Sequence, residues 1–248
     1  MTGEPEEALR LVFDRTYAQF WATELGGERL EADLARIWAA CQLRKGMSVL
    51  DLGCAHGRIA NRLAGDGLAV TAFDQSADLL ALARAAAPDP PPAFVQGDMR
   101  ALDMPGCFDA VLLWFSTFGY FDDDENLTVL KRVLCSLRPG GSLAIETRNW
   151  DRIHRDFDRW SVRVNGDDLL VERHEFVPAT GRQETEQFLI VGDCRYQRSY
   201  FLRRYTCAEL TAMLRGAGFA AVDVYGEDLT PLSVEHERFI AVARKDAA

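Results

Sequence analysis

Three segments of this chain are apolar through nearly every consecutive position: VLDL at 49–52, AVTAF at 69–73 and FDAVLLWF at 108–115. Such runs are typical of strands that helices cover on both faces, as in a parallel sheet. Helical patterns separate the runs, and this alternation predicts a doubly wound α/β domain. The expected strands are 47–52, 68–73, 92–95, 108–114 and 142–147, and the expected helices are 57–65, 77–87 and 124–137.

The segments that flank this alternation have different patterns. Apolar stripes with helical spacing predict two helices before it, over 8–22 and 28–43. After it, short runs of alternating apolar and polar residues predict antiparallel hairpins with one solvent-exposed face over 160–205. The remaining expected elements are a turn at 138–141, a helix over 208–216 that Thr206 caps, and strands over 219–225 and 237–243.

Composition excludes several classes of protein. The chain has 248 residues, 48% of them hydrophobic, so it can bury one sizeable core. Its net charge of -10 works against nonspecific attraction to nucleic acid or other polyanions. Six dispersed cysteines without a CxxC pair indicate neither a metal site nor a disulfide framework. Since there is also no signal-peptide core and no apolar run long enough for a membrane span, we expect a cytoplasmic protein without membrane partners.

The glycine loop between the first strand and the first core helix limits which ligand can bind there. A phosphate-binding loop would need GxxxxGK[ST], and no such motif is present. A dinucleotide fold requires GxGxxG, but here only Gly53 and Gly57 stand in the loop and the third glycine is missing. Asp74 follows the second strand, 21 positions after Gly53, where a carboxylate can accept hydrogen bonds from both ribose hydroxyls. The loop therefore predicts ribose recognition without a pyrophosphate site.

A second carboxylate extends this argument. Asp98 follows the third strand, where a ligand lying across the carboxyl ends of the strands places its base. There it can accept a hydrogen bond from an exocyclic amine such as that of adenine. Asp74 and Asp98 beside a tight glycine turn therefore predict a site for an adenosine that carries no phosphate.

These motifs together resemble those of the class I S-adenosylmethionine-dependent methyltransferases. VLDLGCAHGRIA is similar to the family's first motif, VTAFDQS to the second, QGDM to the third, and LRPGG to the turn before the fifth strand. The resemblance covers about 48–147 and continues more loosely to the end. It implies a Rossmann-like, seven-stranded mixed sheet of order 3-2-1-4-5-7-6 with the last strand antiparallel, interrupted after strand 5 by the antiparallel β insertion. Ala55 replaces the usual middle glycine, which is tolerated if its φ is negative.

The resemblance also implies a division of the chain and a set of site residues. Residues 1–45 form helices on the substrate side, 46–158 with 206–248 form the S-adenosylmethionine-binding core, and 159–205 form the insertion. The expected cofactor-binding residues are Asp51, Gly53, Cys54, Ala55, Gly57, Asp74, Gln75, Asp98, Met99, Trp114 and Ser116. The expected substrate pocket contains Trp21, Tyr120, Arg148, Tyr200 and Tyr205, and the catalytic candidates are His154 and Tyr17.

The favoured hypothesis is an enzyme that transfers methyl from S-adenosylmethionine to O, N or C of a small metabolite, releasing S-adenosylhomocysteine. The segment 115–147, which contains LRPGG, resembles together with the insertion a subgroup that commonly methylates small molecules and natural products. Alternatives are an RNA or protein methyltransferase on the same core, or a non-catalytic nucleoside-binding protein. We interpret the arginine cluster at 195–204 as one polar sheet face with Glu184 and Glu186 as partners, rather than as a nucleic-acid site. The chain is expected to be a monomer or homodimer.

Overall fold

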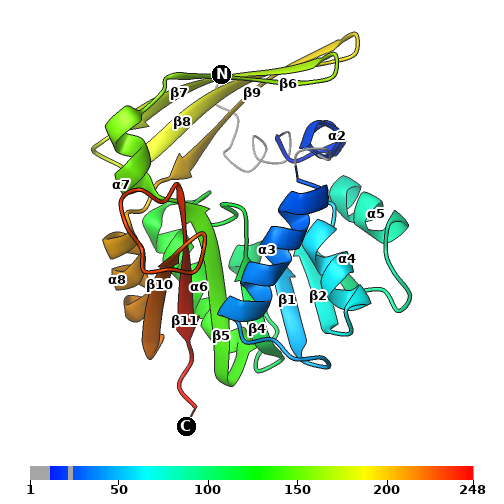
Figure 1. Ribbon diagram of the computed structural model, residues 1–248, viewed down its shortest axis with the longest axis vertical. Coiled ribbons are helices and arrows are strands. Elements are labelled where there is room, and N and C mark those ends of the chain that lie inside the picture. The colour runs from blue at the N-terminus through cyan, green and yellow to red at the C-terminus, as the bar shows by residue number, and fades with distance from the viewer. Residues whose placement is uncertain (1–11, 22–24, 248) are drawn as a thin grey trace.

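A computed structural model describes residues 12–21 and 25–247. Its larger sheet has seven strands in the order β10-β11-β5-β4-β1-β2-β3 (Figure 1). All neighbours are parallel except the pairs that β11 forms with β5 and β10. The predicted order 3-2-1-4-5-7-6 with an antiparallel last strand is therefore confirmed. The strands are β1 (Ser48–Leu52), β2 (Ala69–Asp74), β3 (Ala93–Gln96), β4 (Phe108–Leu113), β5 (Leu137–Arg148), β10 (Ala221–Gly226) and β11 (Arg238–Arg244).

Helices cover both faces of this sheet, which explains the uninterrupted apolar runs. Val49 and Leu112 pack into one buried cluster, whereas their neighbours Leu50 and Val111 pack into the other. Since successive side chains of a strand point to opposite faces, both sets of positions are mostly apolar. One cluster includes residues of α3 (Gly27–Ala40), α4 (Arg58–Gly65) and α5 (Ala77–Ala85), and the other includes residues of α6 (Asp123–Ser136) and α8 (Cys207–Ala217).

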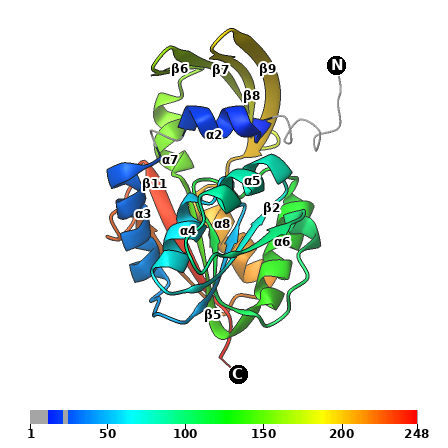
Figure 2. The same cartoon turned by 90° about the vertical axis from the view of Figure 1, so that its right-hand side faces the viewer.

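The insertion forms a second, antiparallel sheet of four strands, which we call the roof. It consists of β6 (Trp160–Asn165), β7 (Asp168–Val177), β8 (Arg182–Val191) and β9 (Cys194–Arg203), paired in sequence order. The roof and α2 (Arg15–Trp21) lie together at one end of the core sheet (Figures 1 and 2). The short elements α7 (Trp150–Ile153) and η2 (His154–Asp156) lead from β5 into the roof.

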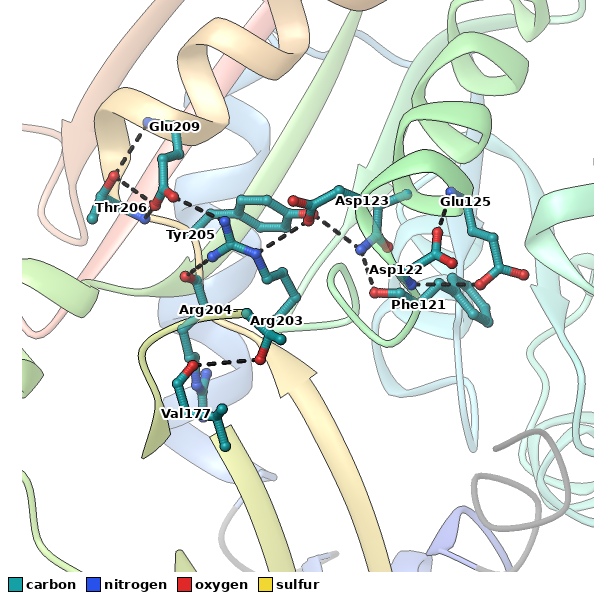
Figure 3. Close-up of polar contacts among 12 residues, drawn as sticks. Phe121, Asp122, Asp123, Glu125, Val177, Arg203, Arg204, Tyr205, Thr206 and Glu209 are labelled. Carbon is teal, nitrogen blue, oxygen red and sulfur yellow. Dashed lines mark hydrogen bonds and ion pairs between the residues drawn. The ribbon is translucent and has the colours of Figure 1, made fainter. Parts of the chain in front are cut away.

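Arg203, at the end of β9, fixes the roof to the core (Figure 3). Its guanidinium is within 3.1 Å of Asp123 on α6 and 2.8 Å of Glu209 on α8. Its backbone N–H donates to the carbonyl of Gly119 at 2.7 Å. A side chain at Gly119 would place its Cβ 2.7 Å from the carbonyl oxygen of Arg203, so this contact requires glycine.

Two local predictions differ from the structure. Residues 138–141 belong to β5 rather than to a turn, because the strand begins at Leu137 and pairs with β4 across a register shift between Phe108 and Ala110. Of the helix expected over 8–22, the structure shows α2. Residues 8–11 and 22 lie outside the described part of the chain. Within that part, no helix is both long and apolar enough to cross a membrane.

The interpretation of the arginine cluster is also wrong. Arg198 is 6% exposed and bonds to Asp14, while Arg203 bonds to Asp123 and Glu209. Glu186 instead binds Arg173 and Gln197 across the roof, and Glu184 lies opposite Phe201. Arg198 and Arg203 therefore connect the roof to other elements, so the cluster does not form one solvated face.

Candidate active site

A cavity of about 410 Å³ lies between the carboxyl edge of the core strands and the roof. Its wall combines residues of α2, of the loops after β1, β2, β3 and β4, and of the roof strands. Most predicted site residues meet here: Tyr17, Trp21, Asp51, Gly53, Cys54, Ala55, Asp74, Gln75, Asp98, Met99, Trp114, Ser116, Tyr120, Arg148 and Tyr200. Segments distant in the sequence thus form one site.

The glycine loop turns tightly at the floor of this cavity. Gly53 has φ of +78°, and a Cβ on it would lie 2.2 Å from Cγ2 of Thr117. The backbone N–H groups of Gly53 and Cys54 both donate to the carbonyl of Phe73, at 2.7 and 3.0 Å. Only glycine allows the backbone at position 53 to lie this close to Thr117, because it has no side chain and reaches positive φ at little cost.

Two further positions of the loop differ from expectation. Ala55 has φ of +50°, not a negative value, so its methyl is held in the left-handed region. Its N–H donates to Oδ2 of Asp74 at 2.8 Å, which helps to hold this conformation. Gly57 lies outside the cavity wall, and a Cβ on it would lie 2.7 Å from Cβ of Ala83. We therefore correct the role of Gly57 from ligand binding to close packing between the loop and α5.

Asp74 presents a fixed carboxylate at the end of β2. Its two oxygens accept the N–H groups of Ala55 and Ser76, each at 2.8 Å, and the residue is 8% exposed. Burial raises its pKa, and these backbone hydrogen bonds oppose the shift. Each carboxylate oxygen has a second lone pair available for a ligand on the cavity side.

Asp98 and Asp51 line other parts of the same wall. Asp98 caps the short helix η1 (Met99–Ala101) and forms an ion pair with Arg100 at 2.5 Å, while its side chain remains 36% exposed. Asp51 is 3% exposed, and burial raises its pKa to about 7. Asp98 therefore remains accessible to a polar ligand, whereas Asp51 lies in the floor.

The family of the chain follows from its similarity to known proteins. Residues 49–141, from β1 into β5, match a model described as a methyltransferase domain. The cypemycin N-terminal methyltransferase of a Streptomyces species is 29% identical over 185 residues, covering 73% of this chain and 76% of that protein. The solved CcbJ methyltransferase of Streptomyces caelestis superposes with a TM-score of 0.80 at 21% identity, covering 96% of this chain and 98% of that one. CalS10, an amino pentose methyltransferase from Micromonospora echinaspora solved with S-adenosylmethionine bound, gives 0.70 at 22% identity, covering 93% and 97%.

Residues 49–141 are a methyltransferase domain of the S-adenosylmethionine-dependent class. The cavity fits that cofactor in its chemistry: a tight glycine turn in the floor, two carboxylates at strand ends and apolar side chains such as Met99 beside them. A buried ring nitrogen of His56 has no hydrogen-bond partner among the described residues. Nη2 of Arg58 is also buried without a hydrogen-bond partner among the described residues. Both groups belong to residues of the cavity wall, so they are available to bind a ligand next to the loop.

The N-terminal helix of this methyltransferase is held against the roof. Nη2 of Arg198 donates to Asp14 and to Thr16, each at 2.7 Å. Asp14 in turn accepts the N–H of Tyr17 at 3.2 Å, at the start of α2. Asn165 of β6 also donates to the carbonyl of Phe20 at 2.7 Å. These contacts position Tyr17 and its helix over the cavity.

The phenols of the cavity are half-buried and remain protonated. Burial is the main cause that raises the pKa of Tyr17 and Tyr200 well above the usual range, and it raises that of Tyr120 to about 12. A phenol in that condition donates hydrogen bonds and does not act as a base near neutral pH. The catalytic candidate Tyr17 is therefore placed at the site as a neutral group.

Two other predicted residues lie elsewhere. His154 is exposed in η2, outside the cavity wall, where its ring contacts Trp150 and Phe176. Tyr205 is buried in the core, stacked on Phe118, and its hydroxyl donates to Asp123 at 2.6 Å. We correct both assignments: His154 packs at the entrance to the roof, and Tyr205 stabilises the junction shown in Figure 3.

The roof contributes polar cavity residues that the sequence analysis missed. Glu172 is 8% exposed and accepts hydrogen bonds from Ser161 at 3.2 Å, Gln187 at 3.1 Å and Tyr200 at 3.4 Å. Arg204 follows β9 and donates from Nε to Gln183 at 2.9 Å. Strand parity could have identified Arg204, because it lies four positions after Tyr200 and therefore on the same face of an extended chain.

Proposed function

We propose that this methyltransferase acts on O, N or C of a small-molecule metabolite held under the roof. The observation that carries the proposal is the single cavity, to which the cofactor-side carboxylates and the roof residues Glu172, Tyr200 and Arg204 all contribute. A small acceptor can enter such a space, whereas a polymer would need an open, basic groove. The amino pentose substrate named for CalS10 is in keeping with this class.

We infer that Asp74 binds the ribose hydroxyls and that Asp98 lies near the adenine. Asp74 is suited to this because its two backbone hydrogen bonds fix the carboxylate before a ligand arrives. Arg58 is suited to the carboxylate of the methionine part, since it pairs with Asp33 at 2.9 Å and keeps Nη2 without a partner in the described structure. Cys54, Gln75, Met99, Trp114 and Ser116 would complete the cofactor wall.

When bound, S-adenosylmethionine supplies an already activated methyl group on a sulfonium. The protein must then align the acceptor in line with that group and exclude water. Tyr17 and Trp21 close the space from α2, and Tyr120 and Tyr200 close it from the core loop and the roof. Glu172 is the carboxylate that the roof strands present to the cavity in the described residues, so it can orient a protonated or hydroxyl acceptor.

Calorimetry with S-adenosylhomocysteine tests the cofactor site. Asp74→Ala should weaken binding by about 1–3 kcal/mol, because hydrogen bonds to a charged group are lost. Asp103→Ala, at an exposed aspartate after η1, serves as the matched control and should bind as the wild type does. Unchanged affinity in Asp74→Ala would remove the ribose assignment, and no binding to the wild type would remove the proposed function.

A further inference from the structure

Two arginines of the cavity have no acidic partner. Arg148, at the end of β5, forms no hydrogen bond or ion pair through its side chain in the described structure. Arg204 donates only to the neutral Gln183, and its Nη1 is buried without an acceptor among the described residues. Both line the cavity. Guanidinium groups in such a place lack the counter-charge that partly buried cations usually have.

Other arginines of the cavity have their positive charge balanced by a nearby acid. Arg58 pairs with Asp33 at 2.9 Å, and Arg238 pairs with the buried Glu146. These acids lie outside the cavity wall, so they neutralise the arginines from behind. Neither Arg148 nor Arg204 has a comparable acid behind it.

Burial disfavours the charged forms of both arginines. Burial and, after it, the nearby positive charge of Arg148 lower the pKa of Arg204 to about 10. Burial also lowers the pKa of Arg148, and the charge of Arg238 adds to this effect. Glu237 and then Glu172 oppose the shift of Arg148 from a distance, but among the described residues neither carboxylate forms an ion pair with Arg148. The carboxylate of Glu172 is hydrogen-bonded to Ser161 and Gln187 instead.

We propose that Arg148 and Arg204 bind an oxyanion group of the methyl acceptor, and that this group is a carboxylate. The inference rests on the proposed function and names the substrate class of the same site. A guanidinium donates two parallel hydrogen bonds to a carboxylate, and it stays charged where an amine would lose its proton. The aromatic rings of Tyr120 and Tyr200, with centroids 6.4 Å apart, line the wall beside Arg204 and suit a planar carrier of that group.

A phosphate group can accept the same hydrogen bonds from arginine, so the test must distinguish a carboxylate ligand from a phosphate ligand. The protein, saturated with S-adenosylhomocysteine, is titrated by calorimetry with benzoate, benzamide and phenyl phosphate, which share one ring and differ in the head group. Benzoate should bind at least about tenfold more tightly than benzamide, since the amide cannot neutralise a guanidinium. Phenyl phosphate binding more tightly than benzoate would overturn the choice of carboxylate while keeping the oxyanion site.

Variants test whether Arg148 and Arg204 cause the preference for benzoate over benzamide. Arg148→Met and Arg204→Met should each weaken benzoate binding by about tenfold or more and leave benzamide binding within about twofold. Arg195→Met, at an exposed arginine of β9, is the matched control and should change neither. S-adenosylhomocysteine affinity should stay within about twofold in all three variants, which shows that the site is folded.

The outcomes separate this inference from the function on which it rests. Loss of S-adenosylhomocysteine binding in the wild type contradicts the cofactor site itself. Normal cofactor binding with equal affinity for benzoate and benzamide, or with no measurable binding of either anion, overturns the oxyanion site alone. Benzoate binding that survives Arg148→Met combined with Arg204→Met also overturns it.

Discussion

Gly53→Ala perturbs the floor of the active site most directly. At φ of +78° an alanine is strained, and its Cβ would lie 2.2 Å from Cγ2 of Thr117. The left-handed conformation costs about 1–2 kcal/mol, and relief of the overlap costs about 1–3 kcal/mol more. The free energy of unfolding should therefore fall by about 2–5 kcal/mol.

Thr117→Ser separates the two contributions. It deletes Cγ2 and keeps the hydroxyl, which donates to the carbonyl of Trp114 at 2.6 Å. The remaining side-chain atoms of Thr117, Cβ and Oγ1, would lie 3.5 and 3.6 Å from the added methyl, which is ordinary contact. Gly53→Ala in the Thr117→Ser background should thus keep the backbone strain and lose the overlap.

Urea unfolding of the four proteins measures the coupling between the two changes. Thr117→Ser alone should cost about 0.5–1.5 kcal/mol, as for other deleted methyl groups. The double variant should be more stable than the sum of the single effects predicts, by about 1–3 kcal/mol. Additivity within about 0.5 kcal/mol would refute the steric argument, because the loop would then avoid Thr117 by moving.

Three further changes probe other parts of the molecule. Because burial raises the pKa of Asp51 from 3.8 to about 7, the folded state retains a proton that the unfolded chain releases. The contribution of Asp51 to stability should therefore fall as pH rises from 3.8 through about 7, and the difference between wild type and Asp51→Asn in thermal unfolding should change over that range. Arg203→Met should lower the free energy of unfolding by about 1.5–3 kcal/mol in urea, since its charged hydrogen bonds to α6 and α8 are lost, whereas Arg195→Met should change it by less than about 0.5 kcal/mol. Arg58→Met should weaken S-adenosylhomocysteine binding about tenfold in calorimetry, while Arg62→Met on the same helix should not; equal affinities would contradict the role of Arg58.

The core of the fold could be predicted because each of its signals is local. Two-sided burial produces the runs at 49–52 and 108–115, and close approach to Thr117 and Phe73 requires glycine at 53. Asp74 can be identified from the sequence because strand ends of a parallel sheet meet at one edge. These constraints apply within a strand and the loop that follows it, so one stretch of sequence contains them.

The positions of His154 and Tyr205 depend on long-range packing. The rings of Trp150 and Phe176 hold His154 in η2, and nothing near position 154 indicates Phe176 as a neighbour. Tyr205 was assigned to the same pocket as Tyr200, although five positions separate them and an extended chain would place them on opposite faces. Parity applied consistently would have excluded Tyr205 and selected Arg204.

In the roof, the alternation of side chains along each strand does not reveal which face of the sheet points toward the core. Alternation divides its residues into two faces, and the usual rule places the apolar face inside. Here Trp160, Val162 and Val164 of β6 are 58%, 62% and 71% exposed, while Glu172 and Arg198 of the opposite face are buried. The inward face combines these polar groups with the buried Leu170 and Leu189, because it covers a cavity and also packs against Phe20 of α2. Which face of the roof points toward the core sheet therefore depends on the cavity between the two sheets. That cavity forms only when the whole chain is folded, so no single segment of the sequence indicates it.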